Sequence, residues 1–351
     1  MKLIGIASYV REVAELEWSA IRPFHFTLVA LASLALGTWS PAESTEVGPL
    51  LLEAKIPLGE VAGRIDHMTV DLARHRLFVA ELGNNTVGVV DLESRKVVHR
   101  LTGLAEPQGV GYVPANDTVY VANGGDGSVK IFRGPDYAPA GRVDLGKDAD
   151  NIRVDAATTL LFVGYGSGGI GVIDPQSNSK IKAFPLKAHP ESFQLDNTAG
   201  EIFVNLPNVR SIAVLNKNIG ELRATWPMRY GANFAMALDN ERKRVLVVFR
   251  SPAKLVALDM QTGAVAGETD ACGDADDLFL DAKRKRIYIS CGAGFIDVLN
   301  AGDPKYLRLA RVPTVSGART ALFVPQMDQF LLAVRARAAE PAAIWVYRAA
   351  P

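Results

Sequence analysis

Cysteine is almost missing from this chain of 351 residues, which contains only Cys272 and Cys291. No CxxC pair, no CxxCH run and no metal-ligand spacing of cysteines occurs, so the sequence offers no haem-attachment or zinc motif. An even number of cysteines permits one disulfide, which would close a loop of about 20 residues. A pair of buried free thiols is the alternative, and both interpretations stay open here.

An excess of charge of either sign is also absent. Lys plus Arg and Asp plus Glu each number 38, so no global field attracts nucleic acid or an anionic membrane. Aromatic residues make up 8% of the chain, and few of them stand in the basic loops, which argues against direct nucleic-acid recognition. With 48% hydrophobic and 22% charged residues, the composition is that of an ordinary globular protein.

One uncharged apolar run stands near the N-terminus, FTLVALASLALG at 26–37, with Arg22 before it and SPA at 40–42 after it. A membrane-spanning helix takes about 20 apolar residues, so this run is too short to cross a bilayer comfortably. The pattern predicts a secretory signal peptide over 1–42 with cleavage after Ala42; an uncleaved N-terminal anchor is the alternative. We therefore expect a periplasmic or secreted protein, with a short linker at 43–49 and one domain over 50–351.

Helical periodicity is missing from the rest of the chain, where a short apolar strand recurs every 41 to 43 residues. A second apolar run follows each of these strands, after a link rich in Gly, Asn and Asp, which supply the positive φ of hairpin turns. The recurring apolar strands, the first of each pair, are RLFVA near 77, TVYVA near 119, LLFVG near 161, EIFVN near 202, RVLVV near 245, RIYIS near 287 and QFLLA near 330.

A further short strand ending in VD, LD or VP precedes each of these pairs, and a fourth strand, such as RVDLG at 142–146 or KAFPL at 182–186, follows. Each unit thus holds four strands in about 42 residues, the repeat of a propeller blade. The sequence therefore predicts an all-β, seven-bladed β-propeller with four antiparallel strands per blade. The seventh unit supplies only three strands. We expect LLEAKIPL at 51–58 to complete the last blade and close the ring, which leaves only short edges.

Two stretches of the repeat resemble a known family. VYVANGGDGSVKIF at 119–132, and the longer stretch at 77–114 that begins LFVAELGNNT, are similar to the YVTN-type repeat of the YncE-like exported bacterial propellers. The resemblance covers nearly all of 50–351 and is strongest in the first three units. It implies the fold and an exported location, but no single activity, because propellers of one fold host many functions.

The entrance to the first strand of each blade lies 11 residues before each FV-type strand. In a propeller this first strand lines the central channel, so these positions should form a ring at one channel mouth. Asn151 and Asp277 adjoin two of the positions, and Phe234 is the alternative to Asn233. The predicted ring consists of Asp66, Gln108, Asp150, Glu191, Asn233, Asp276 and Arg319.

Four ring members are carboxylates, namely Asp66, Asp150, Glu191 and Asp276. Like charges gathered at a narrow mouth cost free energy unless a cation, protons or an arginine offsets them. Oxygen ligands of this kind select Ca²⁺ or Mg²⁺, so the ring predicts one divalent cation. A water-filled channel that solvates the carboxylates, or simple turn-forming roles, are the alternatives. The local stretch DADDLFLDAKRK lacks the Gly and Glu of an EF-hand.

Histidine is scarce, with five in the chain, and His67 stands directly beside ring residue Asp66. Neighbouring carboxylates favour its cationic form, so His67 is a candidate general acid or base. A histidine that only hydrogen-bonds a carboxylate for structure is the alternative. No Ser-His-Asp order and no G-x-S-x-G motif indicates nucleophilic catalysis.

Taken together, the residues favour a non-enzymatic exported binding module, expected to be monomeric, whose partner is an unknown protein or a small anionic ligand. The alternative is a metal-assisted hydrolase or lyase with its site at the channel mouth and His67 as proton carrier. An electron-transfer role lacks any cofactor ligand. Arginines at hairpin turns predict a basic patch for an anionic partner, with solvated loop charges as the alternative. These arginines are Arg210, Arg250, Arg335 and Arg337.

Overall fold

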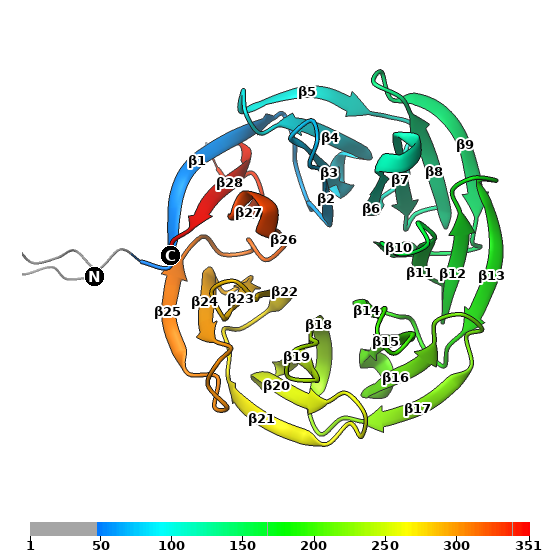
Figure 1. Ribbon diagram of the computed structural model, residues 1–351. Coiled ribbons are helices and arrows are strands. Elements are labelled where there is room, and N and C mark those ends of the chain that lie inside the picture. Colours follow the sequence, from blue (N-terminus) through cyan, green and yellow to red (C-terminus); the bar gives the residue numbers. More distant parts are fainter. Residues whose placement is uncertain (1–47, 167, 339) are drawn as a thin grey trace, which may run out of the picture. The chain divides into compact units, whose positions relative to one another are not determined.

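The computed structural model describes residues 48–166, 168–338 and 340–351. They form seven four-stranded antiparallel sheets arranged as blades around a central channel (Figure 1), which confirms the predicted seven-bladed propeller. The predicted signal peptide and most of the predicted linker lie outside the described residues. Within the described ranges, no helix has the length and apolar character needed to cross a membrane.

The strands follow one another in chain order within each blade. Blade 1 contains β2 (Met68–Asp71), β3 (Arg76–Glu81), β4 (Thr86–Asp91) and β5 (Lys96–Leu101). Blade 2 contains β6 (Pro107–Val113), β7 (Thr118–Asn123), β8 (Ser128–Arg133) and β9 (Ala138–Asp144). Blade 3 contains β10 (Ala149–Val154), β11 (Leu161–Tyr165), β12 (Gly169–Asp174) and β13 (Ser179–Pro185). Blade 4 contains β14 (Phe193–Asp196), β15 (Glu201–Leu206), β16 (Ser211–Asn216) and β17 (Leu222–Pro227).

The remaining blades repeat the pattern. Blade 5 contains β18 (Gly231–Asp239), β19 (Arg244–Ser251), β20 (Ala253–Asp259) and β21 (Val265–Asp270). Blade 6 contains β22 (Ala275–Asp281), β23 (Arg286–Cys291), β24 (Phe295–Asn300) and β25 (Arg308–Pro313). Blade 7 contains β26 (Ala321–Val324), β27 (Gln329–Val334), β28 (Ala342–Ala349) and β1 (Leu50–Gly59). Short 3-10 turns lie at Leu82–Asn84, Pro114–Asn116, Pro207–Val209 and Pro325–Met327.

Burial of the strands explains why the sequence repeats as it does. The second strand of a blade is apolar on both faces and buried, as in β3, because neighbouring blades cover both of its sides. The fourth, outer strand is mostly exposed, as in β13. Phe78 of blade 1 stacks on Tyr112 of blade 2 with ring centroids 5.6 Å apart, so the hydrophobic core lies between blades.

An aspartate recurs at the end of the first strand of several blades, and it stabilises the turn that follows. Asp71 is 2% exposed, and its Oδ1 accepts hydrogen bonds from the backbone N–H groups of Ala73 at 3.0 Å and Arg74 at 3.3 Å. Such side-chain to backbone bonds replace those that a turn leaves unmade. The equivalent aspartates of four other blades do the same, and they are Asp155, Asp196, Asp239 and Asp281.

Strand β1 closes the ring as predicted. It pairs antiparallel with β28 from Leu50↔Ala349 to Gly59↔Ala342, so the first and last parts of the described chain share one blade (Figure 1). Ile56 of β1 is fully buried in a cluster that joins blade 7 to blade 1. The closing strand is therefore part of the core and also satisfies the edge of β28.

Candidate functional site at the mouth of the central channel

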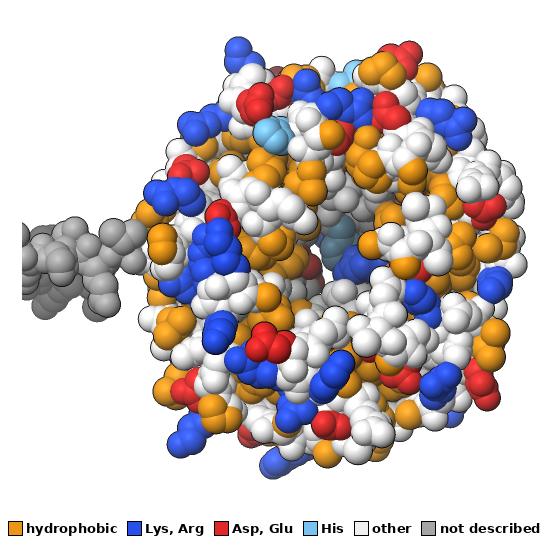
Figure 2. All heavy atoms as spheres, in the orientation of Figure 1, with side chains coloured by type: hydrophobic (Ala, Val, Ile, Leu, Met, Phe, Trp, Pro, Cys, Tyr) orange, Lys and Arg blue, Asp and Glu red, His pale blue; other side chains and the backbone are white. Residues whose placement is uncertain are grey.

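The entrances of the seven first strands converge on a cavity of about 510 Å³, which we call the mouth. The space-filling view, from the face where the first strands end, shows the ring hollowed at its centre, with histidine and charged side chains deep in the channel (Figure 2). The neighbour Asn151 also lines the mouth. Six of the seven predicted ring positions line the cavity, namely Asp66, Gln108, Asp150, Glu191, Asp276 and Arg319.

Of the two residues predicted for blade 5, the alternative Phe234 lines the mouth and Asn233 does not. Asn233 is fully buried, and its Nδ2 donates to Asn205 Oδ1 at 3.0 Å and to the Ser211 carbonyl at 3.1 Å. The register of β18 shifts between Asn233 and Met236. A bulge of this kind re-aims the side chains around it, so counting at a fixed interval misses by one residue.

The first cluster in the mouth joins His67 to two carboxylates from different blades. His67 Nε2 lies 3.7 Å from Asp66 Oδ1 and 3.9 Å from Asp150 Oδ1. Arg64 Nη2 contacts Asp66 Oδ2 at 2.5 Å. Burial alone would lower the pKa of His67, but Asp66, Asp277 and Asp150 outweigh it, so that the pKa is raised. His67 therefore tends to be cationic, as the sequence predicted, and acts as an ionic partner inside the mouth.

The second cluster contains His189, which was not among the residues predicted for the site. Its Nε2 lies 3.6 Å from Asp150 Oδ2, and its Nδ1 lies 3.5 Å from Asp148 Oδ2. The Nδ1 also bonds the Gly166 carbonyl at 2.6 Å. The bond to Asp150 raises the pKa of His189 to about 9 against an opposing effect of burial, so His189 carries a positive charge at neutral pH.

Glu191 is a half-buried carboxylate of the mouth without a partner among the described residues, whereas Glu106, which also lines the mouth without one, is exposed. No described residue donates a hydrogen bond to the Glu191 side chain or forms an ion pair with it. Burial, reinforced by Asp150, raises the pKa of Glu191 to about 7, and nearby His189 opposes this shift. The buried Oδ1 of Asn151 also lines the mouth without a hydrogen-bond partner. Glu191 and Asn151 are therefore two lining residues with an acceptor that no described residue satisfies.

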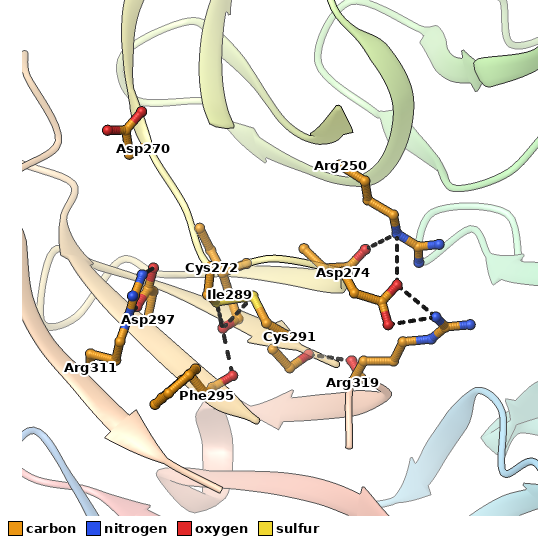
Figure 3. The surroundings of a disulfide bond; sticks show 12 residues. Arg250, Asp270, Cys272, Asp274, Ile289, Cys291, Phe295, Asp297, Arg311 and Arg319 are labelled. Atoms are coloured by element: carbon orange, nitrogen blue, oxygen red, sulfur yellow. Dashed lines mark hydrogen bonds and ion pairs between the residues drawn. A yellow bond between two sulfur atoms is a disulfide. The ribbon is translucent and has the colours of Figure 1, made fainter. Parts of the chain in front are cut away.

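In the third cluster, Arg250 and Arg319 meet Asp274 and Asp276. Figure 3 shows Asp274 with both arginines. Arg250 donates from Nε to the Ala275 carbonyl at 2.7 Å and contacts Asp276. Arg319 Nη1 donates to Asp274 at 2.7 Å, and its Nε lies 3.2 Å from Asp276 Oδ2. These contacts join blade 5, blade 6 and the entrance of blade 7.

These contacts change the interpretation of the basic patch. Arg250 turns into the channel, where its Cζ lies 3.7 Å from the centroid of the Phe234 ring. Arg337 is exposed and pairs with Glu340 at 3.7 Å, and Arg210 is exposed. Burial lowers the pKa of Arg335, and repulsion from Arg319 adds to this shift. The four arginines thus do not form one free basic surface, because carboxylates and an aromatic ring bind two of them.

The disulfide of the structure holds this third cluster in place. Cys272 and Cys291 are bonded with their Cα atoms 5.9 Å apart, and both are buried. The Gly292 N–H donates to the Asp274 carbonyl at 2.8 Å, so the bridge and this bond fix the turn that carries Asp274 (Figure 3). The sequence left a disulfide and a pair of free thiols open, and in the structure the two cysteines form the disulfide.

A second cavity of about 390 Å³, which we call the lower compartment, continues the channel below the mouth. Both cavities are lined by His67, Ser192 and Asp276, so they adjoin. Asp277, predicted beside the ring, lies here instead, and its Oδ2 accepts a bond from the Ala321 N–H at 2.8 Å. Sequence reasoning missed Arg153, which lines this compartment two residues after Asn151 in the same strand.

The predicted divalent cation is not favoured by this arrangement. Among residues 48–166, 168–338 and 340–351, no three His, Cys, Asp or Glu side chains group in a way that could hold a metal ion. Three of the four candidate ligands already have cationic partners: Asp66 has Arg64, Asp150 has His189, and Asp276 has Arg250. The cation stays a prediction, and the binding of a ligand in the mouth does not require it.

Comparison with known proteins identifies the fold. No protein-family model and no curated protein matches the chain. A chain of the Kuenenia stuttgartiensis hydrazine synthase matches with a TM-score of 0.70 and 16% identity, over 85% of this chain and 99% of that chain. A chain of a mitotic checkpoint complex matches with a TM-score of 0.72 and 13% identity, over 93% of this chain and 98% of that chain.

The WD40 repeats of RRP9 match with a TM-score of 0.71 and 9% identity, over 84% of this chain and 96% of that chain. At these identities the similarity extends to the seven-bladed propeller fold alone. What this chain does therefore has to be argued from its own site.

Proposed function

We propose that the protein is a binding module that holds a small polar ligand in the mouth of its central channel. The observation that carries the proposal is the pair of acceptors without a described donor, the Glu191 carboxylate and the Asn151 Oδ1, in a cavity where most other charged groups, exposed Glu106 apart, are already paired. A buried acceptor without a donor costs free energy. A ligand that donates hydrogen bonds to both atoms removes that cost.

The size and character of the mouth suit this function. Its volume of about 510 Å³ lies within the range of about 300–1,000 Å³ that small-molecule sites have. Phe234 contributes an aromatic ring to the wall, and the guanidinium of Arg250 stacks on that ring. The ion pairs around the wall fix the side chains before a ligand arrives, and such preorganisation reduces the entropy lost on binding. The ligand is therefore expected to carry hydroxyl, amide or ammonium donors.

Export is the second part of the proposal. It is supported by the apolar run at 26–37 with SPA at 40–42 and by the resemblance of the repeats to YVTN-type exported propellers. One disulfide in the propeller also suits an oxidising compartment. N-terminal sequencing of the protein recovered from the periplasm or the medium of an expressing bacterium tests it. A mature chain beginning at Glu43 supports export by a cleaved signal, and a full-length chain retained in the cytoplasm contradicts it.

A ligand screen by thermal unfolding tests the binding function. The full chain is heated with amino acids, amines, sugars and organic acids, and a ligand at 100 times its Kd should stabilise the native state by about 2.7 kcal/mol. Any ligand that raises the unfolding temperature is then titrated calorimetrically against the wild type and Glu191→Gln. Loss of the Glu191 carboxylate should weaken binding of a donor ligand roughly tenfold or more.

The matched control is Glu221→Gln, which makes the same change at an exposed position before β17. This variant should bind as the wild type does. Equal affinity in the Glu191→Gln variant and the wild type would show that the ligand does not use the mouth. A screen without any stabilising compound would contradict a small-molecule function and turn attention to protein partners.

A second candidate function is acid–base catalysis in the same mouth, as in a hydrolase or lyase. One observation favours it, because Glu191, with a pKa of about 7, lies beside cationic His189, with a pKa of about 9. Groups with such displaced pKa values collect at catalytic sites. Lactone and ester hydrolysis by the wild type, compared with Glu191→Gln and His67→Gln, tests it. Turnover that both variants retain would assign the activity to another source.

A further inference from the structure

The side chain of Arg153 lies in the lower compartment of the channel without an ionic partner. It comes from the first strand of blade 3, and its Nη1 donates to the carbonyl of the preceding residue, Ile152, at 3.0 Å. Its Cζ lies 5.7 Å from the centroid of the Phe193 ring. No described residue forms an ion pair with it. A guanidinium has five N–H donors, so most of the donors of Arg153 face the cavity unused.

Asp277 and Asp150 attract Arg153, but neither forms an ion pair with it among the described contacts. Asp277 faces the same compartment, but its Oδ2 is bound by the Ala321 N–H, and burial raises the pKa of Asp277 to about 6. The side-chain donors of Ser192 and Gln194 are given to the carbonyls of Phe234 and Met236. Burial lowers the pKa of Arg153 itself, which shows that its charge is poorly solvated there. A charge of this kind is stabilised by an anion.

The compartment has room for such an anion. Its volume is about 390 Å³, and its wall combines polar groups with an apolar part that includes Val110, Ile152 and Leu278. An apolar wall strengthens the attraction between a guanidinium and an oxyanion, because it lowers the local dielectric constant. His67, whose pKa is raised, stands at the boundary with the mouth and adds a second positive charge near the entry.

We infer that the lower compartment is an oxyanion site, in which Arg153 receives a carboxylate or phosphate group. A guanidinium binds either group through two parallel hydrogen bonds. The inference rests on the proposed function and deepens it. The donor end of the ligand lies in the mouth against Glu191 and Asn151, and its oxyanion reaches Arg153. The ligand class is then a small zwitterion or hydroxylated acid with donors and an oxyanion at opposite ends.

The test uses acetate and inorganic phosphate alone, so it does not depend on the full ligand being known. Each anion is titrated calorimetrically into the full chain in chloride buffer at constant ionic strength. Saturable binding by the wild type is expected, with Arg153→Met weakening it about tenfold or more. Arg153→Lys keeps the charge but not the fork of donors, and should retain part of the affinity. Circular dichroism establishes that the variants fold.

Arg223→Met is the matched control, because Arg223 lies on the outer strand β17 with 47% of its side chain exposed. Binding that Arg153→Met leaves intact, or no saturable binding of either anion to the wild type, would overturn the inference. Tighter binding of phosphate would indicate a phosphorylated ligand, and tighter binding of acetate a carboxylic acid. The anions do not require Glu191. Anion binding without any donor ligand in the screen would therefore contradict the function of the mouth and leave the Arg153 site standing.

Discussion

The imidazole Nε2 of His189 lies 3.6 Å from Oδ2 of Asp150, across the boundary between blades 3 and 4. Asp150 belongs to the first strand of blade 3, whereas His189 lies in the loop that leads to blade 4. With 18% of the His189 side chain exposed, the pair is only partly screened by water. The contact therefore ties two blades together at the mouth and makes the stability of the propeller depend on pH.

The direction of this dependence follows from the pKa of His189, about 9 in the folded protein against 6.5 for a free histidine. A raised pKa stabilises the fold fully below pH 6.5, and the stabilisation is lost as pH rises through 9. The loss should amount to roughly 3 kcal/mol. Urea unfolding at pH 6, 7.5 and 9 measures it. His189→Gln should remove this part of the slope, whereas His99→Gln, at an exposed position of β5, should keep it. Equal slopes in all three proteins would contradict the pairing.

The charged form of Glu191 should destabilise the fold at neutral pH, whereas the charged form of His189 stabilises it, because the Glu191 carboxylate has no ionic partner. Its pKa is about 7 in the fold against 4.5 in the free residue. The stabilisation that its proton confers is present below pH 4.5 and lost as pH rises through 7. At pH 8, Glu191→Gln should therefore be more stable than the wild type by roughly 1–3 kcal/mol. Urea unfolding at pH 8 measures this, with Glu221→Gln as control. A destabilised Glu191→Gln variant would mean that the carboxylate has a partner.

The disulfide between Cys272 and Cys291, 19 residues apart, should contribute to stability by restricting the unfolded chain. A loop of this size is worth about 3 kcal/mol in the chain-entropy model. We expect a reductant to lower the free energy of unfolding of the wild type by about this amount. The Cys272→Ala, Cys291→Ala double variant should show no response to reductant. A thiol assay on unfolded, unreduced protein should find no free thiol, and two free thiols would contradict the bridge.

Closure of the ring by β1 should depend on its buried face. Ile56 is fully buried, whereas Leu52 of the same strand is 46% exposed. Ile56→Ala should cost about 2–5 kcal/mol, because it removes buried methyl groups and leaves a cavity. Leu52→Ala should change stability by less than about 0.5 kcal/mol. Denaturant unfolding of both variants compares them directly. Equal small effects would show that β1 is only loosely attached.

The divalent cation predicted from the carboxylate ring can be tested without a variant. Because Asp66, Asp150 and Asp276 contact Arg64, His189 and Arg250, we expect EDTA to leave the unfolding temperature unchanged. We also expect less than one Ca²⁺ or Mg²⁺ per chain by elemental mass spectrometry. A bound ion at 100 times its Kd would add about 2.7 kcal/mol. One ion per chain with an EDTA-sensitive transition would restore the metal-assisted alternative.

The architecture could be predicted from the sequence because a propeller is a local repeat. Each blade buries the same strands against its neighbours, so apolar runs such as those of β3 and β7 recur at nearly equal intervals. The turn aspartates, Asp71 among them, mark the end of the first strand for a local reason. The missing strand of the seventh unit predicted closure by β1, since an open sheet edge is a liability.

The ring at the mouth could be predicted in position but not in chemistry. Equal spacing placed Asp66, Asp150 and Asp276 around one cavity. It failed at Asn233, where a bulge in β18 shifts the register, because periodic counting contains no information about a local insertion. The approach of Arg250 to Asp276 joins residues of adjacent blades, and no pattern within one repeat encodes a contact between two repeats.

The sequence by itself thus determined the fold, the number of blades, the closing strand and the ring of polar positions, because these follow from short-range periodicity and burial. Only the tertiary structure decided which charges are paired and which are free. It paired Asp150 with His189, left Glu191 without a partner, and placed Arg153 in the lower compartment. Ion pairing depends on distances of a few ångströms between side chains of different blades, and these distances are set by how the blades pack around the channel.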